Sequence, residues 1–295
     1  MSKLTKVSFI GLGVMGYHMA GHILKSGRAD LLVYNRTTEK SLVWRDEFGG
    51  KYAESLEQAV SDAEVIIVCS GKDEDMEEIV FSSEGIYKHL KKGSVLIDHT
   101  TTSYKLAQKL NDSLKQIDVG FIDAPVSGGE AGAINGVLSV MVGGNQQTLD
   151  SVEYLIDSYS KNISYMGNSG YGQLAKMVNQ ICIAGVLQGL SEGLLFAESE
   201  GIDMVNLLSA ISGGAAQSWQ MVNRAETMHK RDFDFGFAIK WMVKDLGYCL
   251  DRAKDNKTQL PLVSEVYDRY VFLMNNSHDR SDTSALMLYE ELKKI

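Results

Sequence analysis

A glycine pattern near the N-terminus constrains the fold of this chain more than any other feature. Gly11, Gly13 and Gly16 directly follow the apolar run Val7–Ile10 and precede a helix-like segment that ends at Gly27. A strand, a turn of the form GxGxxG and a helix together hold the pyrophosphate of a dinucleotide. The chain has 28 glycines, so a packing turn is the alternative, but the context favours a binding site. The predicted cofactor-binding turn consists of Gly11, Leu12, Gly13, Val14, Met15 and Gly16.

Short β-branched runs alternate with helical patterns through the first half of the chain. The expected strands are Lys6–Ile10, Leu31–Tyr34, Val65–Cys69, Val95–Asp98, Val119–Asp123 and Leu138–Val142, and the expected helices include Met15–Ser26, Thr38–Phe48, Asp75–Val80 and Tyr104–Lys115. This alternation predicts an α/β domain of the Rossmann type, with a parallel sheet and right-handed crossovers. The last strand follows a glycine-rich segment, which leaves an antiparallel pairing open.

The second half of the chain shows only helical patterns. A breaker at Gly167–Gly172 precedes a long apolar-rich segment from Gln173 to about Ser199. We therefore predict a dinucleotide-binding domain over residues 1–166 and an all-α domain for substrate binding and dimerisation over residues 167–295. The apolar segment is interrupted by Gln188, Ser191 and Glu192, so we expect no membrane span.

Composition narrows the function classes. Asp and Glu number 38 against 29 Lys and Arg, and the net charge is −9 without a basic run, which argues against a nucleic acid or an anionic membrane as partner. The three cysteines lie far apart without a CxxC pattern, and the six histidines are scattered, so we expect neither disulfides nor a metal. A strand-like run begins at Lys6, and we expect no targeting segment and a cytoplasmic location.

The segment Asn35-Arg36-Thr37 bears on cofactor choice. Rossmann domains that bind NAD usually place an acidic residue about 20 residues beyond the glycine pattern, on the ribose 2′-hydroxyl. Here no carboxylate is present, and a guanidinium with short polar neighbours is able to hold a 2′-phosphate. The sequence favours NADP(H), with NAD(H) as the alternative. Arg36 as a solvated loop charge is the competing interpretation.

Two further segments have the chemistry of a substrate site. Ser127, Gly128 and Gly129 follow a strand, and a hydroxyl beside exposed backbone N–H groups suits a small carboxylate, although an ordinary turn has the same composition. Lys176 lies early in the long apolar helix with Asn179 on the same face. A buried lysine must be paired or have a depressed pKa, which would make it a usable acid or base; a surface lysine is the alternative.

These segments together resemble the β-hydroxyacid dehydrogenase family. The resemblance rests on GLGVMG at the start, Asp123–Gly129 (DAPVSGG), Gly172-x-x-x-Lys176-x-x-Asn179 and Lys244-Asp245-Leu246-Gly247. It implies that Ser127, Gly128 and Gly129 bind the substrate carboxylate, that Lys176 is the proton donor and acceptor, and that Asn179 or Gln180 orients the substrate. It also implies that Lys244 and Thr101 lie near the nicotinamide. Ser70 is expected on the cofactor wall, although Cys69-Ser70-Gly71 stands where many relatives have Leu-Pro.

The expected activity is hydride transfer between a nicotinamide and a small β-hydroxyacid or its semialdehyde. A tartronate semialdehyde or glyoxylate reductase and a 3-hydroxyisobutyrate-type dehydrogenase are the leading possibilities, with L-serine oxidation as a rival. A non-catalytic dinucleotide-sensing module would dispense with Lys176, and imine reductases usually have another residue type there. Because the long helix is apolar nearly all round, we expect a homodimer or homotetramer.

Overall fold

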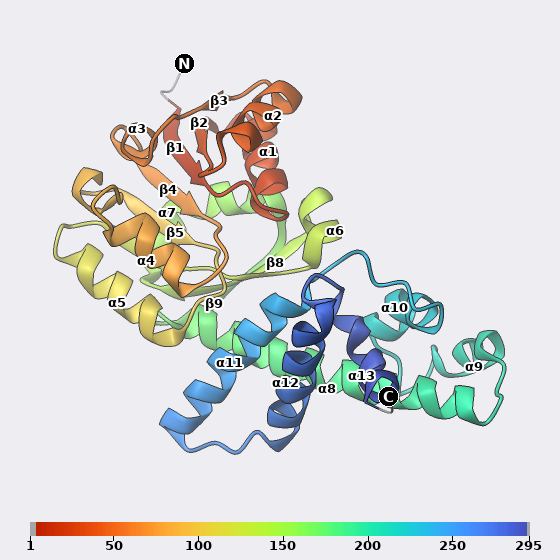
Figure 1. The fold of residues 1–295 in the computed structure, drawn as a ribbon. Coiled ribbons are helices and arrows are strands. Elements are labelled where there is room, and N and C mark those ends of the chain that lie inside the picture. Colours follow the sequence, from red (N-terminus) through yellow and green to blue (C-terminus); the bar gives the residue numbers. More distant parts are fainter. Residues whose placement is uncertain (1–3, 294–295) are drawn as a thin grey trace. The chain divides into compact units, whose positions relative to one another are not determined.

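The computed structural model describes residues 4–293, which form two compact units that divide between Lys176 and Met177. The first unit is α/β and the second is helical (Figure 1). The boundary predicted at residue 166 lies within the last strand, Ser160–Gly167, whereas the structural division lies inside the following helix, Tyr171–Ser199.

Nine strands form one sheet in the part of the chain that the structure describes. They are β1 (Thr5–Ile10), β2 (Ala29–Tyr34), β3 (Lys51–Tyr52), β4 (Val65–Val68), β5 (Val95–Asp98), β6 (Gly120–Asp123), β7 (Val126–Ser127), β8 (Leu138–Gly144) and β9 (Ser160–Gly167). The strand order is β3-β2-β1-β4-β5-β6-β8-β7, and β9 pairs with β8. The six strands from β3 to β6 are parallel and have the Rossmann order, which confirms the predicted fold class.

The direction in which successive strands are added to the sheet reverses between β1 and β4, and these two strands are direct neighbours. In sheets of this kind, ligands bind outside the carboxyl ends of the strands at this reversal. The glycine pattern follows β1 at this position. Beyond β6, β8 pairs antiparallel with β6 and β7 and parallel with β9. The strand expected at Leu138–Val142 therefore has both parallel and antiparallel neighbours.

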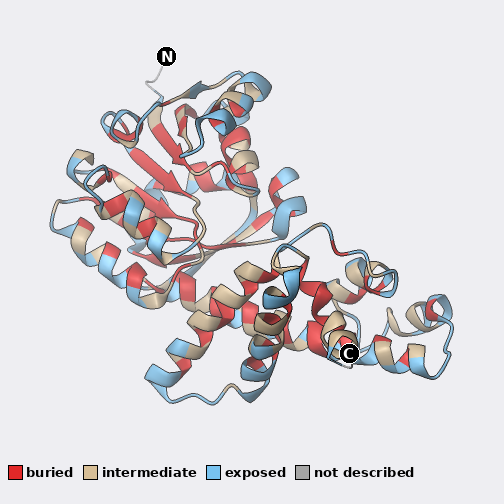
Figure 2. Ribbon diagram, in the orientation of Figure 1, coloured by how far each residue is buried: buried red, intermediate tan, exposed pale blue. Residues whose placement is uncertain are grey.

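The central strands contribute to an apolar cluster on each face of the sheet, because successive side chains of a strand point to opposite sides. On β4, Val65 and Ile67 pack in one apolar cluster, whereas Ile66 and Val68 pack in the other. The central strands β4, β5 and β6 accordingly appear mostly buried in Figure 2. The helices of this unit are α1 (Gly16–Ser26), α2 (Thr38–Phe48), α3 (Leu56–Val60), α4 (Asp73–Phe81), α5 (Tyr104–Lys115), α6 (Gly129–Ile134) and α7 (Gln146–Ile156), with short 3-10 turns η1 (Tyr87–His89) and η2 (Asp157–Tyr159).

The second unit is built around α8 (Tyr171–Ser199), whose first six residues belong to the first unit. The other segments are α9 (Met204–Ile211), α10 (Trp219–His229), α11 (Ile239–Asn256), α12 (Pro261–Leu273), η3 (Met274–His278), η4 (Thr283–Met287) and α13 (Leu288–Leu292). By length and composition α8 could cross a membrane, but a core helix passes the same test, and 44% of its most apolar window is buried inside the protein. Its buried residues include Ala184, Leu187, Leu190 and Leu194.

Candidate active site

The glycine turn after β1 has the geometry of a phosphate cradle. Gly11 has φ +100°, and a Cβ on it would collide with the carbonyl oxygen of Cys69. A Cβ on Gly16 would collide with the carbonyl oxygen of Gly11, so this glycine lets α1 pack against the turn. By contrast, a Cβ on Gly13 would have open space around it, which is the room that an approaching pyrophosphate needs. The residues present therefore fit a dinucleotide.

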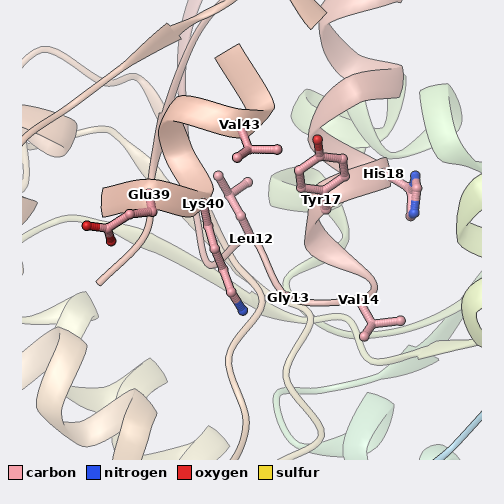
Figure 3. A pocket seen from close by; sticks show the side chains of 8 residues that line it. All are labelled: Leu12, Gly13, Val14, Tyr17, His18, Glu39, Lys40 and Val43. Carbon is pink, nitrogen blue, oxygen red and sulfur yellow. The ribbon is translucent and has the colours of Figure 1, made fainter. Parts of the chain in front are cut away.

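A shallow cavity of about 360 Å³ lies beside this turn (Figure 3). It is lined by Leu12, Gly13, Val14, Tyr17, His18, Glu39, Lys40 and Val43. In Figure 3 the side chains of Glu39 and Lys40 leave α2 in different directions. Lys40 is a cation at the cofactor turn that the sequence interpretation missed, although a basic residue four positions after Arg36 was visible in the sequence.

Asn35 braces the turn from the end of β2. Its Oδ1 accepts a hydrogen bond from the Leu12 N–H at 2.9 Å, and its Nδ2 donates to the Thr37 carbonyl at 3.0 Å. Arg36 next to it has a side chain that is 78% exposed, 3.4 Å from Glu78 and 4.0 Å from Asp75. Exposed ion pairs of this kind stabilise a protein by about 0–1 kcal/mol, so they leave the guanidinium able to exchange partners.

The carboxyl ends of β4 and β5 are joined through Ser70 and Thr100. The Ser70 N–H donates to the Thr100 hydroxyl at 2.9 Å, and the two hydroxyl oxygens lie 3.1 Å apart. Thr101, predicted beside the nicotinamide, is the half-buried residue that follows Thr100. Both loops thus lie at the ends of adjacent parallel strands, next to the glycine turn in the strand order.

The predicted carboxylate-binding turn connects β7 to α6. Gly128 and Gly129 have φ of +135° and +61°, both in the region that favours glycine. A Cβ on Gly129 would meet no atom within 4 Å, so the backbone is open to a ligand there. Ser127, Gly128 and Gly129 therefore present a hydroxyl and accessible backbone at one turn, as a small carboxylate requires.

Lys176 lies beside that turn. Its side chain is buried, and its Nζ donates a hydrogen bond to the carbonyl of Val126 at 2.9 Å. Val126 directly precedes Ser127, so the structure brings the predicted proton donor and the predicted carboxylate turn together. The ammonium is paired by this contact rather than exposed on the surface, which is the alternative that the sequence left open.

Two buried carboxyl groups near these segments were missed by the sequence interpretation. Asp98 and Asp123 end β5 and β6, and both are inaccessible to solvent. Burial raises the pKa of Asp98 to about 7 and that of Asp123 to about 6, although backbone N–H groups that donate to each carboxyl oppose the rise. His99 between them in sequence is also buried, and burial lowers its pKa to about 4.

Within the second unit, the polar residues of α8 and α11 form a chain of contacts. The Asn179 Nδ2 donates to the Gln180 Oε1 at 2.8 Å, and the Gln180 Nε2 donates to the Asp245 Oδ2 at 2.7 Å. Lys244 lies 3.1 Å from the other oxygen of Asp245. Both ends of the buried Gln180 amide are therefore engaged within the second unit.

Asn179 and Lys244 belong to the second unit, whereas the other predicted site residues belong to the first. Over residues 4–293, no group of three or more His, Cys, Asp or Glu side chains is placed to hold a metal ion.

The fold and the site define a nicotinamide dinucleotide-dependent oxidoreductase, and comparisons with known proteins identify its family. Residues 6–167 match the family described as the NAD-binding domain of 6-phosphogluconate dehydrogenase, and residues 170–289 match the one described as NAD-binding of NADP-dependent 3-hydroxyisobutyrate dehydrogenase. The chain belongs to the β-hydroxyacid dehydrogenase family.

Individual relatives cover nearly the whole chain. An uncharacterized oxidoreductase of Shewanella frigidimarina is 47% identical over 96% of this chain and 97% of its own length. The 2-hydroxy-3-oxopropionate reductase of Escherichia coli is 32% identical over 97% of each chain. The structure of Mycobacterium tuberculosis 3-hydroxyisobutyrate dehydrogenase with L-serine superposes with a TM-score of 0.87, at 25% identity, over 99% of this chain and 100% of that one.

Proposed function

We propose that this protein interconverts a small β-hydroxyacid and its semialdehyde, with Lys176 as the proton donor and acceptor and NADP(H) as the preferred cofactor. The observation that supports this most directly is the hydrogen bond from the Lys176 ammonium to Val126, at the entrance to the Ser127–Gly129 turn. It sets a proton-bearing group beside a turn that suits a carboxylate. A dinucleotide-sensing module would have no need of a buried lysine at that place.

Each group has a separate task in the proposed reaction. Ser127, Gly128 and Gly129 bind the substrate carboxylate and so fix its orientation. Lys176 gives a proton to the carbonyl oxygen during reduction and takes it back from the hydroxyl during oxidation. Asn179, three residues further along α8, orients the same oxygen. The nicotinamide, when bound, supplies or accepts the hydride.

The preference for NADP(H) is supported by the charges around the glycine turn. Arg36 and Lys40 provide two cations, and Lys40 lines the cavity beside Gly13. Asn35 provides no carboxylate that would repel a phosphate, and it is held in place by Leu12 and Thr37. Arg36 would exchange its contacts with Asp75 and Glu78 for the 2′-phosphate, since these exposed, long ion pairs are weak and a guanidinium can bind a phosphate through charge-assisted hydrogen bonds.

The names of the relatives guide the choice of substrate. We propose a tartronate semialdehyde or glyoxylate reductase as the first candidate, because the Escherichia coli relative is a 2-hydroxy-3-oxopropionate reductase. A 3-hydroxyisobutyrate-type dehydrogenase is the second candidate. Oxidation of L-serine is the alternative, because the Mycobacterium tuberculosis structure is one with L-serine.

The experiment that tests this proposal is a substrate panel read by nicotinamide absorbance. Tartronate semialdehyde, glyoxylate, succinic semialdehyde and methylmalonate semialdehyde are assayed with NADPH and NADH, and 3-hydroxyisobutyrate and L-serine with the oxidised cofactors. Aldehydes of similar size without a carboxylate are the matched controls. Turnover of the carboxylate-bearing compounds alone supports the proposal, and equal turnover of the uncharged aldehydes refutes the carboxylate site.

We propose further that the chain forms a homodimer or homotetramer through α8. Val178, Cys182 and Val186 recur every four residues on one face of this helix and are exposed, as is Phe196 further along. Val178 is 60% exposed and Phe196 is 64% exposed, which is unusual for apolar residues on a long central helix. Light scattering at micromolar concentration tests this, and a mass near 32.5 kDa would refute it.

A further inference from the structure

The first turn of α8 is attached to the sheet through one carboxylate. Asp123, the last residue of β6, accepts hydrogen bonds from the backbone N–H groups of Gly170 at 2.6 Å and Gln173 at 2.9 Å, one on each carboxyl oxygen. The first N–H groups of a helix have no partner within it, and a negative charge is favoured at this end. Asp123 thus fixes the start of the helix that includes Lys176.

Two glycines leave just enough room for this contact. A Cβ on Gly172 would lie 2.6 Å from the Asp123 carbonyl oxygen and 2.8 Å from its Oδ2. A Cβ on Gly143, from β8, would lie 2.7 Å from its Oδ1. The carboxylate is therefore enclosed by backbone on two sides, and neither it nor the first turn of α8 has space to shift toward the other.

The Gln173 side chain attaches the same turn to a second loop. Its Oε1 accepts from the Thr102 N–H at 3.1 Å, and its Nε2 donates to the Thr100 carbonyl at 2.8 Å. These two partners flank Thr101, which is predicted beside the nicotinamide. Gln173 is completely buried, so both contacts are protected from water.

The contacts of Asp123 and Lys176 connect the same two segments. Asp123 and Val126 lie three residues apart on the segment that leads into the carboxylate turn, and Gln173 and Lys176 lie three residues apart on α8. Asp123 accepts from Gln173, and Lys176 donates to Val126, so the two hydrogen bonds and the two segments form a closed ring that includes the predicted proton donor. A change in one contact must move the other.

We propose that Asp123 and Gln173 are positioning residues that hold Lys176 against the substrate-binding turn and at a fixed distance from the loop that contains Thr101. This inference rests on the proposed role of Lys176. Neither side chain needs to touch the substrate. Their effect is geometric, because displacing a reacting group by about 1 Å can lower turnover about 100-fold.

Asp123→Asn tests the first contact at constant size. The asparagine amide has one oxygen that can accept from Gly170 or from Gln173. Its NH₂ group faces the other backbone N–H, so one of the two hydrogen bonds is replaced by a donor–donor contact. We expect kcat to fall about 10- to 100-fold, while the NADPH dissociation constant, measured by fluorescence without substrate, changes by less than about threefold. The solvent deuterium isotope effect on kcat should increase, because proton transfer becomes slower than the other steps. A folded variant with kcat and isotope effect like the wild type overturns the proposal.

Gln173→Glu tests the second contact and decides the matter if Asp123→Asn does not fold. One carboxylate oxygen of the glutamate can still accept from the Thr102 N–H. The other oxygen replaces the amide nitrogen that donates to the Thr100 carbonyl, so this hydrogen bond is lost and the two oxygens repel each other. We expect the same loss of kcat as for Asp123→Asn. A folded Gln173→Glu protein with wild-type kcat overturns the role of this residue.

Two controls separate positioning from other effects. Asn145→Ala removes the side-chain cap of α7 in the same unit, which loses a hydrogen bond to Thr148; it should lower stability and leave kcat unchanged, and an equal loss of kcat would overturn the proposal. Lys176→Ala is measured in parallel. If Lys176→Ala keeps its activity, the proposed function fails; if it is inactive while Asp123→Asn is fully active, only the positioning role fails.

Discussion

Asp98 and Asp123 are register partners on the adjacent parallel strands β5 and β6, and both carboxyl groups are buried. Asp98 accepts a hydrogen bond from the Thr100 N–H on Oδ1, whereas its Oδ2 has no hydrogen-bond partner among the described residues. Burial, and to a smaller extent the neighbouring Asp123 charge, raises the pKa of Asp98 from 3.8 to about 7. Burial therefore favours the neutral form of Asp98, whereas both oxygens of Asp123 accept backbone N–H groups.

The raised pKa of Asp98 makes stability depend on pH. Because the folded protein holds this proton more tightly than the unfolded chain, the stabilisation is complete below about pH 4 and is lost as pH rises through about 7. Asp98→Asn keeps the acceptor for Thr100 and cannot ionise. Between pH 5 and pH 8, its free energy of unfolding should fall less than that of the wild type, by on the order of 2 kcal/mol at about 1.4 kcal/mol per pKa unit.

Urea unfolding at the two pH values measures this difference. Asp150→Asn on α7 alters an exposed carboxylate and serves as the control. Parallel pH dependence in the wild type and Asp98→Asn would show that Asp98 is ionised in the fold at little cost.

Replacing Lys176 with alanine should abolish most turnover without preventing cofactor binding. General acid–base groups contribute about 10²–10⁴-fold to rate, and the loss should appear in kcat because the proton moves in the transition state. Steady-state kinetics and an NADPH titration check this. Lys161→Ala, an exposed lysine on β9, is the control. Retention of more than about a third of kcat would remove Lys176 from its role.

Gly129→Val should mainly raise KM for carboxylate-bearing substrates. Valine is strained at φ +61°, and its side chain would occupy the open space over the turn. Loss of one charge-assisted hydrogen bond, about 1.5–3 kcal/mol, corresponds to about tenfold or more in KM. Gly27 has φ +66° and equally open surroundings at the end of α1, so Gly27→Val imposes a matched strain away from the turn. Equal KM values for the two variants would contradict the carboxylate site.

Arg36→Ala should weaken NADPH binding about tenfold to a hundredfold and leave NADH binding nearly unchanged. The reason is the loss of one charge-assisted hydrogen bond to the 2′-phosphate, which contributes about 1.5–3 kcal/mol. Lys40→Ala should act in the same direction, and the wild-type preference should shrink as salt rises. The measurement is kcat/KM for NADPH over NADH. Arg45→Ala, at the far end of α2, is the control. An unchanged ratio in Arg36→Ala would leave Arg36 as a surface charge paired with Asp75 and Glu78.

The regular part of the fold could be predicted because its signals are local. The strands β1, β4 and β5 are short, apolar and followed by helical patterns, and they lie within one residue of their predicted ends. β9 was missed because none of its residues is buried, so its sequence shows no apolar alternation. β7 has two residues, too few to show a period.

The candidate site residues that the sequence predicted all belong to local motifs. These motifs include the glycines after β1, the Ser127–Gly129 turn and the segment from Gly172 to Asn179. Asp123 and Gln173 were missed because their meaning depends on partners far away in sequence: the Asp123 carboxylate and the Gln173 N–H are separated by 50 residues. The pairing of Arg36 with Glu78, 42 residues away, is equally invisible before folding.

The unbroken course of α8 has a consequence for substrate choice. Neither glycine nor proline occurs between Gln173 and Ala184, so this stretch is a stiff helix, and Lys176 and Asn179 are separated along its axis by about 4.5 Å. Loop movements cannot alter this spacing. In the reaction that we propose, a substrate therefore brings its reacting oxygen to a donor and an amide whose positions along the helix axis are fixed relative to each other. On this proposal, the residues that distinguish short aldehydes differing by one carbon lie outside this stretch of α8.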